Sequence, residues 1–295
     1  MMPVPKGKII AIGGNVDKGT YPTPSLPNLR RKINFFQQGI LERIHRELYG
    51  KTSRLEIVTT ASLIPEEVGA AYVQAFALLD SHNVGVLHIQ TREEADQPEN
   101  LARLRQAHGV LFTGGDQSRI AAAFLQSQAL SILQQRYQQE EKFLISGTSA
   151  GAMALGNIMI RSAEHRRILA KGTVRLGEGL SLLPNLIIDT HFINRRRMPR
   201  LIESIAAYPD HIGIGLGEDT GVMIRNGNVI ETIGTGLVVL MDGRQLYENN
   251  FPAIANGEAL CLEHLLLHVL PMGKCFMVSP GRFSEAQQGP NHQMF

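Results

Sequence analysis

Residues 142–155 run Lys-Phe-Leu-Ile-Ser-Gly-Thr-Ser-Ala-Gly-Ala-Met-Ala-Leu, and the two halves of this segment differ in character. The first half is short and apolar, which is typical of a strand buried on both faces. The second half is small and alanine-rich, which is typical of the start of a packed helix. We therefore predict a strand that turns directly into a helix, and we expect the rest of the chain to be arranged around it.

The turn between these halves, Gly147–Gly151, matches the G-x-S-x-G pattern of a nucleophilic serine. A serine on such a turn has strained backbone angles, so its neighbours must be small. The turn would project the hydroxyl of Ser149 from the sheet and aim the first helical N–H groups, beginning with Ala150, at a developing oxyanion. Small residues also suit close helix–strand packing without catalysis, but the strand before and the helix after favour a nucleophile.

The chain on either side alternates short apolar segments with segments of helical periodicity. Strands are expected near residues 8–12, 54–61, 84–90 and 109–113, and helices over 30–49, 65–79, part of 92–109 and 118–138. This alternation predicts parallel βαβ units, whose ligands bind beyond the carboxyl ends of the strands. We find no linker, and we expect residues 1–295 to form a single α/β domain.

Gly114-Gly115-Asp116-Gln117 follows the expected strand at 109–113, at the same sheet edge as Ser149. If the two strands are adjacent, the N–H of Gly114 or Gly115 would be the second oxyanion donor, and Gln117 would face the pocket. The alternative is that the two glycines only make a tight turn. Another pair, Gly13-Gly14, lacks the rest of the dinucleotide fingerprint, so we set a nucleotide cofactor aside.

A serine nucleophile needs a base within hydrogen-bond reach, and the base needs an orienting carboxylate. His191 follows an expected strand at 186–188, and Glu218 follows the next one at 212–217. These positions predict a Ser149–His191–Glu218 triad. Asp219 or Asp189 could equally be the orienting acid, and His191 could instead be a structural histidine bonded to Asp189.

Three arginines, Arg195, Arg197 and Arg200, lie close behind the candidate base. Guanidinium groups beside an active site favour a substrate with carboxylates, because they pair with them in a bidentate manner. The alternative is a solvated basic turn. A second basic segment, within 158–174, is interpreted as a solvated face. After it we expect an antiparallel hairpin turning at Asn226-Gly227 and further antiparallel strands towards the end of the chain.

The composition excludes several classes of protein. The net charge of +2 over 295 residues gives no reason to expect a nucleic acid or a membrane surface as partner. Cys261 and Cys275 form neither a metal-ligand pattern nor a disulfide framework. The first residues lack the apolar run of a signal peptide, and no segment approaches the roughly 18 apolar residues of a membrane span. We expect a cytoplasmic protein.

Taken together, these motifs resemble the cyanophycinase family, of the serine peptidase group that also contains peptidase E. The resemblance covers nearly the whole chain, and the block of His191 with the three arginines is its most specific part. Its signatures here are Gly13-Gly14, Ala61-Ser62, Pro65–Gly69, Thr113–Gln117, Gly147–Ala152, Asp189–Phe192, Arg195, Arg197, Arg200, Gly213–Gly215 and Glu218–Thr220.

The resemblance implies a fold like the class I glutamine amidotransferases, a homodimer, and no metal or organic cofactor. It implies Ser149 as nucleophile, His191 as base and Glu218 as orienting acid. The implied substrate is cyanophycin, a polyaspartate backbone with arginine joined to each side-chain carboxylate, cut into β-Asp-Arg dipeptides through an acyl-enzyme. The implied pocket is lined by Gln117, Asp189, Thr190, Arg195, Arg197 and Arg200, with Asp189 meeting a cationic group of the substrate.

Some positions depart from the family pattern: Thr190 stands where Gln is usual, Gly217 where Asp is usual and Gly221 where Ala is usual. None touches the triad, but Thr190 could alter the pocket. A peptidase E-like Asp-specific dipeptidase, or a relative acting on another β-linked aspartyl peptide, therefore remains an alternative. An inactive relative that binds an acidic peptide is disfavoured, because all three triad residues are intact.

Overall fold

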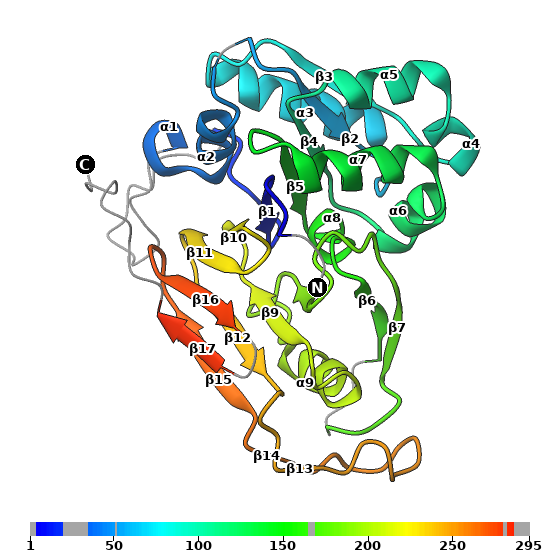
Figure 1. The fold of residues 1–295 in the computed structure, drawn as a ribbon, viewed down its shortest axis with the longest axis vertical. Helices are drawn as coiled ribbons and strands as arrows, with labels where there is room; N and C mark the ends of the chain where they lie inside the picture. Colours follow the sequence, from blue (N-terminus) through cyan, green and yellow to red (C-terminus); the bar gives the residue numbers. More distant parts are fainter. Residues whose placement is uncertain (1–3, 20–34, 51, 165–168, 280–281, 286–295) are drawn as a thin grey trace.

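The computed structural model describes residues 4–19, 35–50, 52–164, 169–279 and 282–285, and these form an α/β fold (Figure 1). Their largest sheet has nine strands in the order β17-β16-β11-β10-β1-β5-β4-β2-β3. Its parallel half consists of β1 (Lys8–Ile12), β5 (Leu144–Thr148), β4 (Gly109–Phe112), β2 (Leu55–Val58) and β3 (Val84–Leu87). β4 and β5 are adjacent, as a second oxyanion donor from Gly114 or Gly115 requires.

Helices cover both faces of this parallel half, because successive strand residues point to opposite sides. Ile10 and Ile12 of β1 pack with α2 (Ile40–Glu47) and α3 (Pro65–Leu78). Ile9 and Ala11 pack on the other face with α5 (Pro98–Gln106), α6 (Gln117–Phe124) and α7 (Gln128–Gln139). The short helices are α1 (Phe35–Gln38), α4 (Arg92–Ala95) and α8 (Ala150–Met153). Burial on both faces explains why the strands are continuous apolar runs.

The antiparallel half consists of β10 (Thr220–Arg225), β11 (Val229–Gly234), β16 (Cys275–Ser279) and β17 (Arg282–Glu285). The hairpin of β10 and β11 turns at Asn226 and Gly227, with φ of 54° and 68°, which confirms the predicted Asn-Gly turn. β1 joins the halves, because it pairs parallel with β5 and antiparallel with β10. The predicted α/β class, with antiparallel strands added towards the end of the chain, is confirmed.

A separate four-stranded sheet carries the segments that precede His191 and Glu218. Its order is β15-β12-β9-β8, from β15 (Leu266–Leu270), β12 (Val238–Asp242), β9 (Ile212–Leu216) and β8 (Leu186–Asp189). β8 and β9 are parallel, and α9 (Met198–Ala207) packs on the sheet through Leu201 and Ile205. Two smaller sheets pair β6 (Ile158–Ala163) with β7 (Val174–Glu178), and β13 (Glu248–Asn249) with β14 (Leu262–Glu263).

The expected long helix at 118–138 is wrong, because the chain breaks it into α6 and α7. Gln126 has a φ of 63°, which a continuous helix does not allow. Ser127 then caps α7, since its Oγ accepts the N–H of Leu130 at 3.0 Å. No glycine or proline marks this break, so the helical periodicity concealed it. Of the helix expected at 30–49, residues 30–34 lie outside the described residues, and Gly39 separates α1 from α2.

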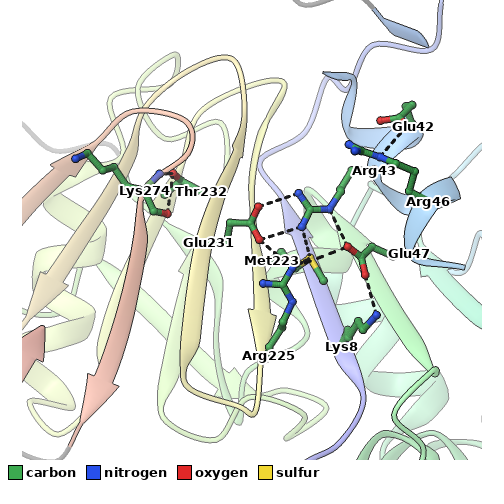
Figure 2. Close-up of polar contacts among 10 residues, drawn as sticks. All are labelled: Lys8, Glu42, Arg43, Arg46, Glu47, Met223, Arg225, Glu231, Thr232 and Lys274. Atoms are coloured by element: carbon green, nitrogen blue, oxygen red, sulfur yellow. Dashed lines mark hydrogen bonds and ion pairs between the residues drawn. The ribbon is translucent and has the colours of Figure 1, made fainter. Parts of the chain in front are cut away.

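Charged side chains fasten α2 to the main sheet (Figure 2). Arg43 donates to both carboxylate oxygens of Glu231 on β11, at 2.8 and 2.9 Å, and to Glu47 at 2.9 Å. Lys8 on β1 contacts Glu47 at 2.8 Å, and Arg225 on β10 contacts Glu231 at 3.0 Å. These pairs are largely buried, so each charge depends on its partners. The network therefore fixes α2 over β1, the strand whose carboxyl end leads into the site described next.

Among the described residues, no helix combines the length and the apolar character needed to cross a membrane.

Candidate active site

Ser149 lies at the end of β5, on the turn into α8, as the pattern of small residues predicts. Its backbone has φ 52° and ψ −114°, and such a conformation costs a serine about 1–3 kcal/mol. A Cβ on Gly147 would lie 2.5 Å from the backbone of Gly151, and a Cβ on Gly151 would collide with the carbonyl of Phe112. These two glycines are therefore required for the turn that presents the serine hydroxyl.

The structure brings together the three predicted triad side chains from two different sheets. Ser149 Oγ lies 3.0 Å from Nε2 of His191, and Nδ1 of His191 lies 2.8 Å from Oε1 of Glu218. With a proton on Nδ1, the imidazole donates to Glu218 and leaves Nε2 free to accept from the serine hydroxyl. His191 is only 8% exposed, whereas the carboxylate of Glu218 is partly open to solvent.

The second oxygen of Glu218 is held by two amides. The side chains of Asn15 and Asn194 donate to Oε2 at 3.3 and 3.2 Å. The other two acids considered from the sequence lie elsewhere: Asp219 accepts the N–H of Asp17, and Asp189 is paired with arginines. Of these three acids, Glu218 is therefore the one whose side chain is hydrogen-bonded to the imidazole of His191.

Three successive carbonyls, from the last residue of β1 and the two residues after it, hold the three segments of the site in place. The oxygens of residues 12, 13 and 14 accept, in turn, the N–H of Ser149 at 2.9 Å, of His191 at 2.8 Å and of Asp219 at 2.9 Å. A Cβ on Gly14, whose φ is 101°, would lie 2.5 Å from Cε1 and Nε2 of His191. The Gly13-Gly14 turn therefore serves as the common support of the site and must approach the imidazole closely.

The predicted oxyanion donors surround Ser149. Ala150 is the first residue of α8, so its N–H has no partner within the helix. Gly114 is close enough that a Cβ on it would lie 3.2 Å from Cβ of Ser149. Gly115, with a φ of 142°, follows it at the wall of the cavity. The N–H of Ser149 is bonded to residue 12 and is not a donor. The choice between Gly114 and Gly115 stays a prediction.

A cavity of about 840 Å³ opens beside Ser149, and its wall is rich in guanidinium groups. The residues that line it are Gly115, Asp116, Gln117, Ser118, Ser149, Ala150, Met153, Arg161, Ser162, Arg175, Leu176, Thr190, Arg195, Arg197 and Arg200. The lining thus contains five arginines and a single acidic residue, Asp116. The excess of positive charge suits a ligand with carboxylates.

Asp189 is placed differently from the prediction. It was expected to line the pocket and meet a cation of the substrate, but its side chain is fully buried and does not line the cavity. It forms a bidentate pair with Arg200 and lies 3.4 Å from Nη1 of Arg197. A buried carboxylate needs such partners. Asp189 therefore holds the two arginines from inside the protein, away from the cavity.

Gln117 and Thr190 do line the cavity, but their polar groups have partners within the protein. The amide of Gln117 donates to the carbonyls of Ile160 at 2.6 Å and Arg161 at 2.8 Å. The hydroxyl of Thr190 donates to the sulfur of Met153 at 3.3 Å. Gln117 therefore supports the β6–β7 wall of the cavity.

Several contributors to the site were missed from the sequence. Asn15 and Asn194 are single loop asparagines, which carry no periodicity or spacing signal. Gly13-Gly14 was recognised as a weak nucleotide signal and as part of the family resemblance, but its contact with His191 was not predicted. Arg161 and Arg175 fell in or beside a basic segment interpreted as a solvated face, and only the pairing of β6 with β7 shows that they line the cavity. Of that segment, residues 165–168 lie outside the described part.

Burial lowers the pKa of His191 below its ordinary value of 6.5, and the hydrogen bond to Glu218 opposes this effect. The positive charges of Arg195 and Arg197 lower the pKa further. The hydrogen bond from His191 is also the main cause that lowers the pKa of Glu218. The lowered pKa favours the neutral imidazole at neutral pH, which is the form that a general base requires.

We expect kcat/KM to persist at pH 6.5 and to fall as the pH drops through the lowered pKa of His191. Replacing Arg195 by Gln removes a repelling charge, so the pKa of His191 should rise and the acidic limb should move to higher pH. A pH–rate profile of both proteins tests this expectation. An acidic limb above pH 6.5 in the unmodified protein, or one unmoved in the Arg195→Gln variant, would contradict it.

No group of three or more His, Cys, Asp or Glu side chains in the described part of the chain is arranged to hold a metal ion.

A serine on a strand-to-helix turn, paired with a histidine and a carboxylate beside a cavity, is the arrangement of a serine hydrolase. This chain has that arrangement at the edge of an α/β sheet, so it belongs to the class of serine hydrolases.

Comparison with known proteins identifies the family. The model of peptidase family S51 matches residues 36–232. The chain is 34% identical to a cyanophycinase of Thermosynechococcus vestitus over 272 residues, which is 92% of this chain and 79% of the relative. It is also 34% identical to a cyanophycinase of Nostoc over 222 residues, 75% of this chain and 74% of the relative. The chain belongs to peptidase family S51 and is a serine-type peptidase.

Among solved structures, a peptidase from an acI-B1 Actinobacterium has a similar fold. Its TM-score is 0.61 at 20% identity, and the match covers 92% of this chain and 97% of that one.

Proposed function

We propose that this peptidase is an exopeptidase of the cyanophycinase type, with Ser149 as nucleophile, His191 as base and Glu218 as orienting acid. The observation that carries the proposal is that Ser149, hydrogen-bonded to His191, lines the same cavity as Arg195, Arg197 and Arg200. The substrate class is supported by the similarity to cyanophycinases over 92% of this chain.

In the acylation step, Oγ of Ser149 attacks the carbonyl carbon of the scissile peptide bond while its proton passes to Nε2 of His191. The carbonyl oxygen becomes an oxyanion, which the N–H groups of Ala150 and of Gly114 or Gly115 stabilise. The C–N bond then breaks, and His191 returns the proton to the leaving amine. The acyl group remains as an ester on Ser149.

In the deacylation step, His191 takes a proton from water as the water oxygen attacks the ester carbon. The ester C–O bond breaks, the proton returns to Oγ of Ser149, and the carboxylic acid product leaves. Glu218 stabilises the imidazolium in both steps through its 2.8 Å hydrogen bond to Nδ1.

Each unit of cyanophycin carries the free α-carboxylate of its arginine. Arg195, Arg197 and Arg200 would bind this carboxylate, and Asp189 supports the latter two from below. Desolvation is the main cause that lowers the pKa of Arg197 to about 10, and the positive charge of Arg200 is the second cause. Arg197 therefore keeps its charge near neutral pH. Thr190 and Gln117 shape the rest of the wall.

The proposal is tested by incubating the purified protein with cyanophycin and identifying the products by mass spectrometry. We expect release of β-Asp-Arg dipeptides and shortening of the polymer from its ends. A series of short α-linked Asp-X peptides serves as the comparison substrate. Cleavage of these peptides without any attack on the polymer would contradict the proposal and would make the chain an Asp-specific dipeptidase.

A further inference from the structure

The wall of the cavity formed by the β6–β7 hairpin carries two arginines that the proposed site does not use. Arg161 on β6 and Arg175 on β7 both line the cavity, and both are exposed. No ion pair joins either of them to an acid among the described residues, whereas Arg197 and Arg200 are tied to Asp189. The hairpin arginines, Arg161 and Arg175, are therefore available to a ligand.

Arg161 lies at a β-bulge in β6, which changes the direction of its side chain. Ile160 pairs with Leu176 and Ser162 pairs with Arg175, so Arg161 is the extra residue in the ladder between them. A bulge re-aims side chains and is over-represented beside active sites. Arg175 lies on the facing strand, opposite the residue after the bulge, which brings the two cations to the same part of the hairpin.

Two further features hold this bulge in place. Gln117, which is 9% exposed, donates its amide to both carbonyls of the bulge, those of Ile160 and Arg161. Gly177 leaves room for the stem of Arg161, since a Cβ there would collide with Cδ and lie 2.9 Å from Cγ of that arginine. An arginine that only faces solvent needs neither the hydrogen bonds of Gln117 nor the space left by Gly177. The arrangement therefore indicates that the side chain of Arg161 is held in place for a ligand.

We propose that Arg161 and Arg175 bind a second carboxylate of the substrate, the arginine α-carboxylate of the dipeptide unit next to the one being cleaved. This inference rests on the proposed function. Each unit of cyanophycin has one free carboxylate. The cavity has two clusters of guanidinium groups: the hairpin arginines form one, and Arg195, Arg197 and Arg200 form the other. Two successive units thus present two carboxylates to two cationic groups.

Gln117 is a positioning residue in this arrangement, because its two hydrogen bonds act on the backbone of Arg161. Gln117→Met removes both donors while keeping a long unbranched side chain. Its effect on binding should not add to that of Arg161→Gln, since both changes remove the same interaction. Additive effects of the two changes would overturn the positioning role.

The test measures binding to Ser149→Ala protein by calorimetry, with one β-Asp-Arg unit and with a synthetic three-unit oligomer as probes. We expect Arg161→Gln to weaken binding of the oligomer roughly tenfold, as for the loss of one charge-assisted contact, and to leave the single unit unaffected. Arg161→Lys should recover part of the loss. The matched control is Arg105→Gln, an exposed arginine of α5 outside the cavity, which should change neither affinity.

Equal weakening of both probes, or no weakening of the oligomer, would overturn the second subsite. Absence of any binding to either probe would overturn it as well. The proposed function is judged separately, by hydrolysis of cyanophycin with the unmodified protein. Hydrolysis combined with an unchanged oligomer affinity in Arg161→Gln would leave the function standing and remove the subsite alone.

Discussion

Replacing Ser149 by alanine is expected to lower kcat on the peptide substrate by roughly four orders of magnitude or more, as for loss of a triad nucleophile elsewhere. The physical reason is that, in the proposed mechanism, the hydroxyl 3.0 Å from His191 supplies the atom that bonds to the scissile carbon. Steady-state kinetics and product analysis by mass spectrometry measure the loss. The melting temperature should change little, because alanine fills almost the same volume on the same turn.

The matched control is Ser146→Ala, three residues earlier on β5. Ser146 is fully buried, and its hydroxyl has no hydrogen-bond partner among the described residues. Its removal should leave kcat unchanged. If Ser149→Ala protein kept more than a few per cent of the activity, the nucleophile would have to be another residue.

Replacing Gly14 by alanine is expected to lower kcat by about a hundredfold, because a displacement of about 1 Å in a reacting group has effects of this size. The new methyl group would lie 2.5 Å from Cε1 and Nε2 of His191, so the imidazole must move away from Ser149. The backbone at φ 101° adds strain of its own. Kinetics should show a fall in kcat larger than any rise in KM.

Gly257→Ala separates these two effects. Gly257 has a nearly equal φ of 93°, but nothing lies within 4 Å of a Cβ built there. Both variants should therefore lose stability through backbone strain, while only Gly14→Ala should lose activity. Equal activity in both variants would contradict the role of Gly14 in placing His191. Such a result would also weaken the idea that the turn after β1 organises the site.

Each of the three residues that donate a backbone N–H to that turn has a strained backbone conformation. Ser149, His191 and Asp219 all have positive φ, at 52°, 48° and 45°, although none is a glycine. Each donates its backbone N–H to one of the three successive carbonyls of residues 12–14. The cost of these conformations is met by the surrounding hydrogen bonds and packing, which is how strained residues persist at functional sites.

Much of the fold could be predicted from the sequence because it depends on local patterns. The apolar runs indicated the strands β1 to β5, and the small residues around Ser149 indicated the strand-to-helix turn. Asn226-Gly227 indicated the hairpin of β10 and β11 through its preference for positive φ. The break between α6 and α7 was not predicted, because the residue with positive φ there is Gln126 and glutamine rarely adopts that conformation.

Some expectations remain predictions. A single domain, a cytoplasmic location and a homodimer are expected from the composition and from the resemblance. The catalytic roles await the variants described above.

Local sequence patterns were enough to predict the turn that presents Ser149, the residue types of a triad and the basic character of the site. These are properties of short segments and of side-chain chemistry. The folded chain was needed to show that Ser149 follows a strand of one sheet while His191 and Glu218 follow strands of another. It also decided that Asp189 is buried beneath its arginines and that Arg161 lines the cavity. These outcomes depend on hydrogen bonds and packing between segments far apart in the chain, which no local pattern encodes.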